Sequence, residues 1–461
     1  MSYSKYLIYQ KQVSYDGGQT WEDVEGETTY SGSPIETYDS ESGCVLDGGY
    51  KYLIVDTSGN TAYKGCDGND VLTEHDIIDT GGMIGGWDNP THLYIGNCVK
   101  TVNITENASI GYFSGITFSR SVKNINAIVG YRNFKSAGYQ IEQTLTIPNT
   151  VETIANSGAY WENHGFQAAR SIIFENNSHL SLIGDYAFNG CTGLTSFNIP
   201  NGVTSIGGHA FAGCTGITSI VLPDGVTVIN GSLFEGCTSL SSVTIGSGVT
   251  SIGYGAFSGC TSLSSVTIPS NTVSIGQHSF ANAGLTSITI PDSVTNIDYH
   301  AFYQCPNLES VFIGSGVTEW GQNVFRCPLT SITVSSNNTK FDSRNNCNAV
   351  ILTSASTIIL GSSSTVIPDG IVELNNCFNG NLNVTDMTIP SSVTNIYNSF
   401  YGCSNLNTIT FLSNDPPTMG KYAFYLAGDF TAYVPRHGTN AYRTAFNATN
   451  GHGSITIIEM S

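Results

Sequence analysis

A short phrase recurs along the chain at an almost fixed distance, and this repeat constrains the fold more than any other feature of the sequence. Its most regular element is a phenylalanine, found at Phe188, Phe211, Phe234, Phe257, Phe280, Phe302 and Phe325, with spacings of 23, 23, 23, 23, 22 and 23 residues. A fixed period of about 20 to 30 residues is typical of units that bury their apolar side only against the next copy. The sequence therefore predicts a solenoid of stacked coils.

Alternation within the phrase predicts one short strand in each coil. Ile288 and Ile290 are two residues apart and share one face of the strand, whereas Ser287 and Thr289 face the other side. Pro291 then ends the strand. Each coil is therefore expected to contain a strand, a turn, a second short extended limb and a phenylalanine that fills the interior.

The segment CTSLSSVTIGSGVTSIGYGAFSGC, residues 237–260, resembles the BspA-like leucine-rich repeat of gut Bacteroidetes and their phages. The resemblance covers about residues 91–435, with a lapse after Cys327 that ends near Met387. It implies a curved, right-handed solenoid with adhesion or recognition roles, and it supplies no catalytic residues. We therefore expect a mainly β fold, a leucine-rich repeat solenoid of about 23-residue coils with a small N-terminal β module.

Three parts are expected along the chain: a small β module at residues 1–88 that serves attachment, the solenoid at 89–425, and a C-terminal capping coil at 426–461. In the first part, SYDGGQTW (residues 14–21) resembles the Asp-box of sialidases, which is a structural hairpin there. The resemblance implies that Asp16 ties the turn and that Trp21 packs beneath it. Asp-Gly-Gly between extended segments is itself a strong turn signal.

Composition and charge exclude several classes of function. The chain has 461 residues, of which 40% are hydrophobic and only 11% are charged, and its net charge is −19. Sixteen Lys and Arg residues against 35 Asp and Glu disfavour nucleic acids and anionic membranes as partners. No apolar run reaches the roughly 18 residues of a membrane-spanning helix. We expect no nucleic-acid binding and no membrane insertion.

Motifs of common enzymes are missing from the sequence. There is no G-x-S-x-G, no H-E-x-x-H and no G-x-x-x-x-G-K-[ST] phosphate loop. We therefore predict that the chain is not an enzyme and needs no cofactor or metal.

The chain has 12 cysteines, and four successive ones, spaced 23 residues apart, share one position of the repeat. They are Cys191, Cys214, Cys237 and Cys260, each three residues after a phenylalanine. Parallel side chains in a stacked column do not turn their Cβ atoms together as a disulfide requires, and no C-x-x-C pair suggests zinc. Because Ala283 occupies the same position, we interpret the column as small buried plugs beside Phe211, Phe234 and Phe257, with a ladder of disulfides as the alternative.

Outward residues of the predicted strands form a Ser/Thr surface that one aromatic residue interrupts. Thr267 and Thr289 belong to this surface, and Phe312 interrupts it. The surface is either a solvated β face or a site for a protein or glycan, with Phe312 and Trp320 as anchors.

A second column lies two residues before each phenylalanine, and it includes His209, Ser232, Gly255, His278 and His300. His278 and His300 are either two exposed imidazoles or a shared metal site, although no carboxylate recurs beside them.

These features predict a non-enzymatic protein for surface recognition, adhesion or structural support. Met1 leads directly into strand-like sequence without an apolar export signal. On that basis we expect a phage virion fibre, decoration or tail-associated protein, localised to the virion, that binds a protein or glycan on a bacterial surface. Residues 1–88 would contact other virion proteins, and repeated virion sites would favour a homo-oligomer. The alternatives are a BspA-like adhesin, at the bacterial surface or secreted, and a glycan-binding accessory of a carbohydrate-active enzyme.

Overall fold

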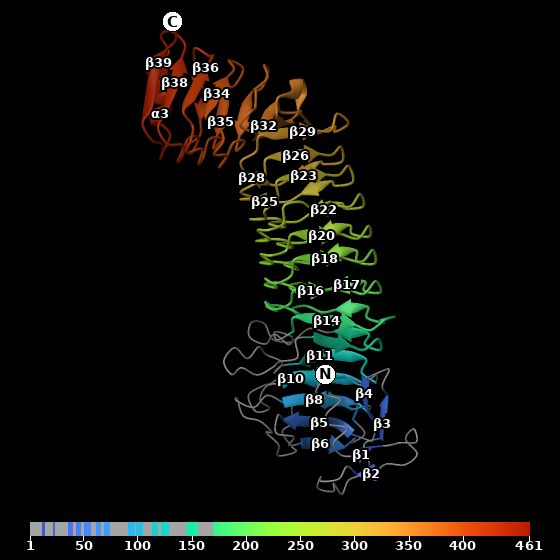
Figure 1. The fold of residues 1–461 in the computed structure, drawn as a ribbon. Coiled ribbons are helices and arrows are strands. Elements are labelled where there is room, and N and C mark those ends of the chain that lie inside the picture. Colours follow the sequence, from blue (N-terminus) through green and yellow to red (C-terminus); the bar gives the residue numbers. More distant parts are fainter. Residues whose placement is uncertain are drawn as a thin grey trace. The chain divides into compact units, whose positions relative to one another are not determined.

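A computed structural model of the chain describes residues 69–73, 91–96, 98–104, 113–118, 121–128, 144–154 and 169–461, together with the strands that precede residue 66. The chain divides into two compact units, residues 1–218 and residues 219–461. In both units the regular secondary structure consists mainly of short β-strands (Figure 1).

In the first unit, antiparallel strand pairs come before parallel sheets. The pairs are β1 (Gln12–Val13) with β2 (Glu22–Asp23), β3 (Glu36–Asp39) with β4 (Gly43–Asp47), and β5 (Tyr50–Asp56) with β6 (Thr61–Gly65). β1 and β2 flank the segment predicted to form the Asp-box hairpin, but Asp16 and Trp21 lie outside the described residues.

Parallel pairing begins within this first unit. β8 (Thr91–Ile95) pairs antiparallel with β5 and parallel with β10 (Phe113–Thr117). A six-stranded parallel sheet has the order β17 (Ser205–Ile206), β15 (Leu182–Ile183), β13 (Thr153–Ile154), β11 (Asn124–Ile128), β9 (Thr101–Ile104) and β7 (Val71–Thr73). A three-stranded sheet contains β12 (Thr144–Ile147), β14 (Ser171–Phe174) and β16 (Ser196–Phe197). Because β7 belongs to the six-stranded sheet, parallel pairing starts before residue 88, where the attachment module was expected to end.

In the second unit, successive coils contribute strands to parallel sheets on two sides of each coil. One side holds β18 (Ser219–Val221), β20 (Ser242–Thr244), β23 (Ser287–Ile290), β26 (Ser310–Ile313) and β29 (Ser331–Val334). The other side holds β19 (Val228–Ile229), β21 (Ser251–Ile252), β22 (Ser274–Ile275), β24 (Asn296–Ile297) and β27 (Glu319–Trp320). Ile252 pairs with Ile275, a separation of 23 residues, and the predicted period is confirmed as the register of the sheets.

The repeated phenylalanines stack face to face in the core. Ring centroids lie 5.4 Å apart for Phe234 and Phe257 and 5.2 Å apart for Phe257 and Phe280, with interplanar angles of 17° and 10°. In the first unit, Phe188 and Phe211 stack at 5.3 Å. All five side chains are fully buried, so the aromatic stack runs through the interior of the coils.

The cysteine column is buried, and its thiols make a contact that the sequence did not reveal. Cys191, Cys214, Cys237 and Cys260 are not disulfide-bonded. Cys214 Sγ donates a hydrogen bond to the Phe188 carbonyl oxygen at 3.0 Å, and Cys260 Sγ donates to Phe234 O at 3.2 Å. The position therefore takes a small side chain that can also link one coil to the preceding one.

The column two residues before each phenylalanine has a left-handed backbone. The φ angles are 55° at His209, 54° at Ser232, 58° at Gly255, 55° at His278 and 58° at His300. Gly adopts this conformation readily, and Asn, Asp and His are the side chains most enriched there. Backbone geometry therefore explains why histidines recur in this column.

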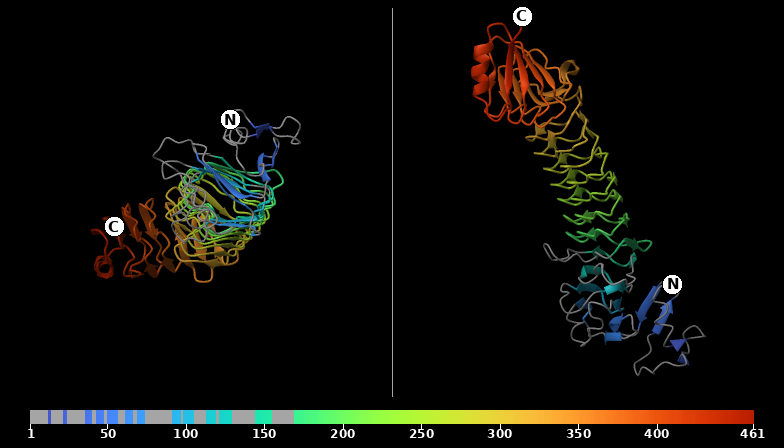
Figure 2. Two further views of the ribbon diagram at one scale, coloured as in Figure 1. Left: turned by 90° about the horizontal axis from the view of Figure 1, so that it is seen from below. Right: turned by 60° about the vertical axis from the view of Figure 1, so that its left-hand side comes forward.

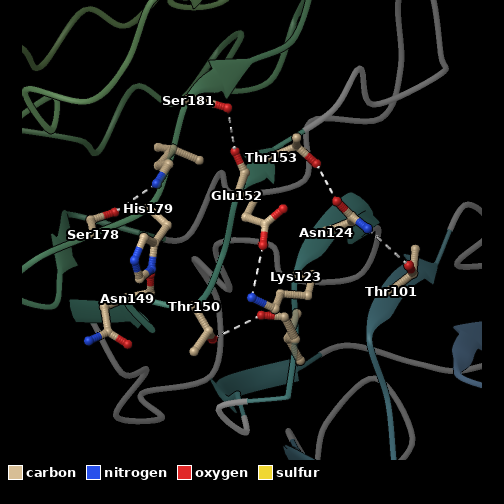
Figure 3. Close-up of polar contacts among 12 residues, drawn as sticks. Thr101, Lys123, Asn124, Asn149, Thr150, Glu152, Thr153, Ser178, His179 and Ser181 are labelled. Carbon is tan, nitrogen blue, oxygen red and sulfur yellow. Dashed lines mark hydrogen bonds and ion pairs between the residues drawn. The ribbon is translucent and has the colours of Figure 1, made fainter.

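Hydroxyl groups of Ser and Thr connect neighbouring coils. Thr250 Oγ1 donates to the Thr227 carbonyl oxygen at 3.1 Å, one coil earlier. In the first unit, Thr150 Oγ1 donates to Val122 O at 3.0 Å (Figure 3). Short hydroxyl side chains thus bond to backbone groups of the neighbouring coil. Long charged side chains would lose more conformational entropy in making the same bonds.

A polar ladder also crosses three strands of the six-stranded sheet, as Figure 3 shows. Thr153 Oγ1 donates to Asn124 Oδ1 at 2.7 Å, and Asn124 Nδ2 donates to Thr101 Oγ1 at 3.4 Å. Beside this ladder, Lys123 Nζ lies 2.8 Å from Glu152 Oε1. Polar side chains of the first unit are therefore paired from coil to coil.

An antiparallel hairpin interrupts the stack in the second unit. It comprises β30 (Phe341–Asp342), the 3₁₀ turn η1 (Arg344–Asn346), β31 (Ala349–Leu352) and β32 (Thr357–Gly361). β25 (Phe302–Tyr303) and β28 (Phe325–Arg326) pair just before this hairpin in the sequence. Parallel pairing resumes from β32 to β33 (Glu373–Asn375), β35 (Asn395–Tyr397) and β37 (Thr418–Met419).

Arg326 connects coils on the two sides of this interruption. Its guanidinium carbon lies 5.6 Å from the ring centroid of Tyr303 and 5.5 Å from that of Tyr401, and Nη1 donates to Tyr303 Oη at 2.8 Å. A Cβ atom on Gly380 would lie 2.5 Å from Arg326 Nε, so glycine leaves room for the guanidinium. A planar cation thus takes the place of an aromatic ring between two tyrosines.

The C-terminal part closes with a helix against a sheet (Figure 2). The sheet contains β34 (Asp386–Ile389), β36 (Thr408–Phe411), β38 (Phe430–Val434) and β39 (Ile455–Glu459), and the helix is α3 (Thr439–Asn447). Tyr442 of α3 is buried, and its hydroxyl donates to Ser413 O at 2.9 Å. No helix in the described part of the chain is long and apolar enough to cross a membrane.

We expect Ser279→Ala to raise the free energy of unfolding by about 1 kcal/mol, because Ser279 Oγ is buried without a hydrogen-bond partner. Ser399 occupies the same repeat position, but its Oγ donates to Tyr397 O at 3.0 Å. Ser399→Ala should therefore lower the stability by about 1 kcal/mol. Urea denaturation of both variants measures the two effects, and changes of the same sign would contradict this account.

Candidate recognition surfaces

The strand face carries three of the residues predicted to bind a partner. Phe312 on β26 points outward with 37% of its surface exposed, and it pairs with Thr289 on β23 and Thr333 on β29. Thr267 is also exposed, in a coil whose equivalent limb is not a regular strand. The structure thus places Phe312, Thr289 and Thr267 on one side of the coils.

Trp320 lies on the other side. It belongs to β27 and pairs with the fully buried Ile297, so it stands in the inward register. Its ring centroid lies 5.9 Å from that of Phe325 and 5.7 Å from that of Phe341. Trp320 is half-buried and does not share a sheet face with Phe312. The structure therefore does not bring the two predicted anchors together.

A different group of aromatic and basic side chains gathers at the turn that holds the phenylalanine stack. We call this group the aromatic edge; it consists of Tyr254, His278, Tyr299, His300, Tyr303 and Arg326. Its members come from three columns of the repeat, which lie three and two residues before the phenylalanine and one residue after it. They belong to four successive coils of the second unit.

The rings of the aromatic edge contact one another directly. His300 stacks between Tyr299, at a centroid distance of 3.6 Å, and Tyr303, at 4.2 Å. His278 meets His300 edge-on at 5.0 Å, and Tyr254 lies 5.9 Å from His278. These contacts form a continuous set of rings across adjacent coils.

Exposure and charge distinguish the aromatic edge from the buried stack. Tyr254 is 57% exposed and Tyr299 is 36% exposed, whereas His278, His300 and Arg326 are half-buried. Partial burial, together with the nearby His278 and Arg326, lowers the pKa of His300 to about 4. The edge therefore combines open tyrosine rings with closely spaced basic groups.

Sequence analysis found only part of this group. The repeat reveals the column that contains His278 and His300. The tyrosines belong to other columns, and they meet the histidines only because of how the turn folds. Within the described residues, no three His, Cys, Asp or Glu side chains gather in an arrangement that could hold a metal ion. The rings of His278 and His300 pack on each other, and His300 also stacks on Tyr299 and Tyr303.

We expect Phe312→Thr to leave the free energy of unfolding within about 0.5 kcal/mol of wild type, because the side chain is exposed and its neighbours are threonines. Trp320→Ala should cost on the order of 2 kcal/mol, because it removes packing against two phenylalanines. Urea denaturation compares the variants. A loss for Trp320→Ala no larger than that for Phe312→Thr would contradict the inward placement of Trp320.

We expect the proton NMR signal of the His300 ring to titrate near pH 4. Removing a nearby cation should raise this pKa, either by Arg326→Gln or by His278→Asn, which keeps a residue suited to the left-handed backbone. Because the unfolded state takes up this proton at a higher pH, stability should fall as the pH decreases from 6.5 towards 4. A His300 pKa that neither variant moves would contradict the account.

Comparison with known proteins identifies the repeat. The family described as "BspA type Leucine rich repeat region" matches residues 162–268, 232–353 and 374–459, in six copies. No curated protein matches the chain. These matched ranges cover more than half of the chain.

Three solved structures are similar to the chain. A leucine-rich repeat protein from Bacteroides ovatus is 21% identical with a TM-score of 0.55, over 90% of this chain and 99% of that one. A leucine rich cell surface protein from Faecalibacterium prausnitzii is 23% identical with a TM-score of 0.39, over 79% and 94%. The leucine rich repeat protein of T. pallidum is 27% identical with a TM-score of 0.31, over 40% and 80%. The expected solenoid class is confirmed, and the chain belongs to the BspA-type leucine-rich repeat family.

Proposed function

We propose that this chain is a non-catalytic recognition protein of a bacterial cell surface and that it binds a macromolecular partner through the aromatic edge. The observation that supports this proposal is the edge itself. Other coils carry small or polar residues at the same repeat positions, such as Gly231, Ser232 and Ser258, so stacking of the coils does not require rings there. Exposed tyrosines with polar ends are common anchors of binding sites.

The repeat architecture supports binding rather than catalysis. Stacked repeats create extended surfaces on which successive coils place equivalent side chains next to each other, and proteins of this kind use such surfaces for binding. In this chain the aromatic edge draws residues from four successive coils. A partner that spans several coils would contact all of them at once.

A bacterial surface suits the chain better than a phage particle. Cys98 is disulfide-bonded, which suits a protein outside the cell, on a cell surface or on a virion alike. The F. prausnitzii protein is described as a cell surface protein, and none of the three similar structures named above is described as a phage protein. The virion assignment and attachment to virion proteins through residues 1–88 therefore have no support from these comparisons.

The strand face is the second candidate for recognition of a protein or glycan. Phe312 is the feature that favours it, because this exposed aromatic residue stands in an outward column that holds threonine on both sides. Thr267 and Thr289 would supply hydroxyl groups beside it. The two candidates use different residues, so variants can separate them.

We expect the purified full chain to adhere to one or more members of a panel of intact bacterial cells and immobilised host glycoproteins. The double variant Tyr254→Gln/Tyr299→Gln should lose most of this adhesion. Glutamine is the native residue at this repeat position in two other coils, Gln277 and Gln322, so the change suits the fold. Phe312→Thr is the matched control and should adhere like wild type.

The adhesion assay and a cell fractionation can each contradict the proposal. Loss of adhesion in Phe312→Thr but not in the double tyrosine variant would show that the strand face, and not the aromatic edge, binds the partner. Protease treatment of intact producing cells should remove the chain if it is displayed outside. Recovery of the chain only in purified phage particles would overturn the bacterial location.

A further inference from the structure

Three basic groups gather at the aromatic edge in a chain that has few of them. The chain has 16 Lys and Arg residues against 35 Asp and Glu. At the edge, the ring centroids of His278 and His300 are 5.0 Å apart, and the guanidinium carbon of Arg326 lies 5.6 Å from Tyr303, which stacks on His300. Because the pKa of His300 is lowered to about 4, its imidazole supplies a hydrogen-bond donor and an acceptor at neutral pH, and Arg326 supplies positive charge in a molecule that is acidic overall.

None of these basic groups has a carboxylate partner. The ion pairs of the described residues join Lys100 to Asp70, Lys123 to Glu152, and Arg344 to Asp342. The nearest acidic residue in sequence is Asp298, whose Oδ1 accepts a hydrogen bond from the backbone N–H of Tyr299 at 2.7 Å. A guanidinium without a counter-charge at a partly exposed site favours an anionic ligand.

Several polar side-chain atoms of the edge also have no hydrogen-bond partner among the described residues. In the described part of the chain, the ring nitrogens of His278 and His300 and the hydroxyls of Tyr254 and Tyr299 make no side-chain hydrogen bond. Most Thr hydroxyls of the neighbouring coils, by contrast, bond to the backbone of the preceding coil, as Thr295 Oγ1 does to Val273 O at 3.3 Å. The edge thus keeps donors and acceptors that a ligand can use.

We propose that the aromatic edge binds an acidic saccharide, of which a carboxylate lies against Arg326, hydroxyls bond to the ring nitrogens of His278 and His300, and sugar rings pack on Tyr254 and Tyr299. The combination of open tyrosine rings with hydroxyl and imidazole groups suits sugar rings, which present apolar C–H faces and hydroxyls together. Ring centroids follow one another at 5.9 Å from Tyr254 to His278 and at 5.0 Å from His278 to His300. This step along successive coils is close to the length of one sugar unit in a linear saccharide.

The charge of the edge selects among saccharides. A neutral sugar would leave the Arg326 guanidinium without a counter-ion, whereas a uronic acid would give it a charge-assisted hydrogen bond. An acidic peptide would satisfy the charge but would not use the exposed tyrosine faces in the same repeated way. This inference rests on the proposed function, because it names the ligand of the same surface.

Titration calorimetry with linear oligogalacturonate tests the inference on the full chain. Methyl-esterified oligogalacturonate, which has the same backbone without the charges, is the matched ligand and should bind at least about tenfold more weakly, as loss of a charge-assisted hydrogen bond predicts. His278→Asn and Tyr299→Gln should each weaken binding several-fold, while Val366→Thr, at an exposed position outside both candidate surfaces, leaves it unchanged. Thermal unfolding checks that all three variants remain folded.

Three outcomes would overturn the inference. These are equal binding of the charged and esterified saccharides, equal binding of polyglutamate, and no effect of the His278 and Tyr299 variants. Failure of the proposed function is a separate result. If oligogalacturonate does not bind but Tyr254→Gln/Tyr299→Gln still abolishes adhesion to cells, the recognition surface stands and the ligand class is wrong.

Discussion

The structure depends on hydrogen bonds that join the backbone of each coil to the next at the turn beside the phenylalanine. In the second unit, Phe257 N–H donates to Ser279 O at 2.7 Å, and Phe280 N–H donates to Ala301 O at 2.8 Å. These bonds hold neighbouring coils in one register, so equivalent side chains must lie above each other. The phenylalanine stack and the cysteine column follow from this register. Each coil is therefore stable only between neighbours, as expected for a one-dimensional repeat.

The same register explains why so few charged residues are needed. When equivalent positions lie on top of each other, identical charges in a column would repel. Hydroxyl groups avoid this repulsion and bond to the backbone of the preceding coil, as Thr250 does with Thr227. An aspartate is tolerated where the next coil offers a donor: the Asp224 carboxylate accepts a hydrogen bond from Ser247 N–H at 2.7 Å, which lowers the pKa of Asp224. The low charge content is thus a consequence of stacking.

The period of the sequence was enough to predict the coils, the buried phenylalanines and the pairing register, because these features repeat. Features that break the repeat were harder to predict. Trp320 occupies the register position of Ile297, but as an aromatic residue that interrupts a uniform register of small and polar residues it resembles a surface anchor in the sequence. The bridge formed by Arg326 depends on a hairpin that brings Tyr401 close to Tyr303. Such contacts join residues that are far apart in the sequence. Aligning the repeats with one another therefore does not predict them.

The aromatic edge shows how a backbone requirement can supply binding groups. The position two residues before the phenylalanine must adopt a positive φ angle, which restricts it mainly to Gly, Asn, His and a few others. Its side chain is not needed for the core, so the choice among these residues is open to selection for function. In two adjacent coils the choice is histidine, at His278 and His300, and the neighbouring column supplies the exposed Tyr254 and Tyr299. A conformational constraint of the solenoid thus places imidazoles side by side where a ligand can reach them.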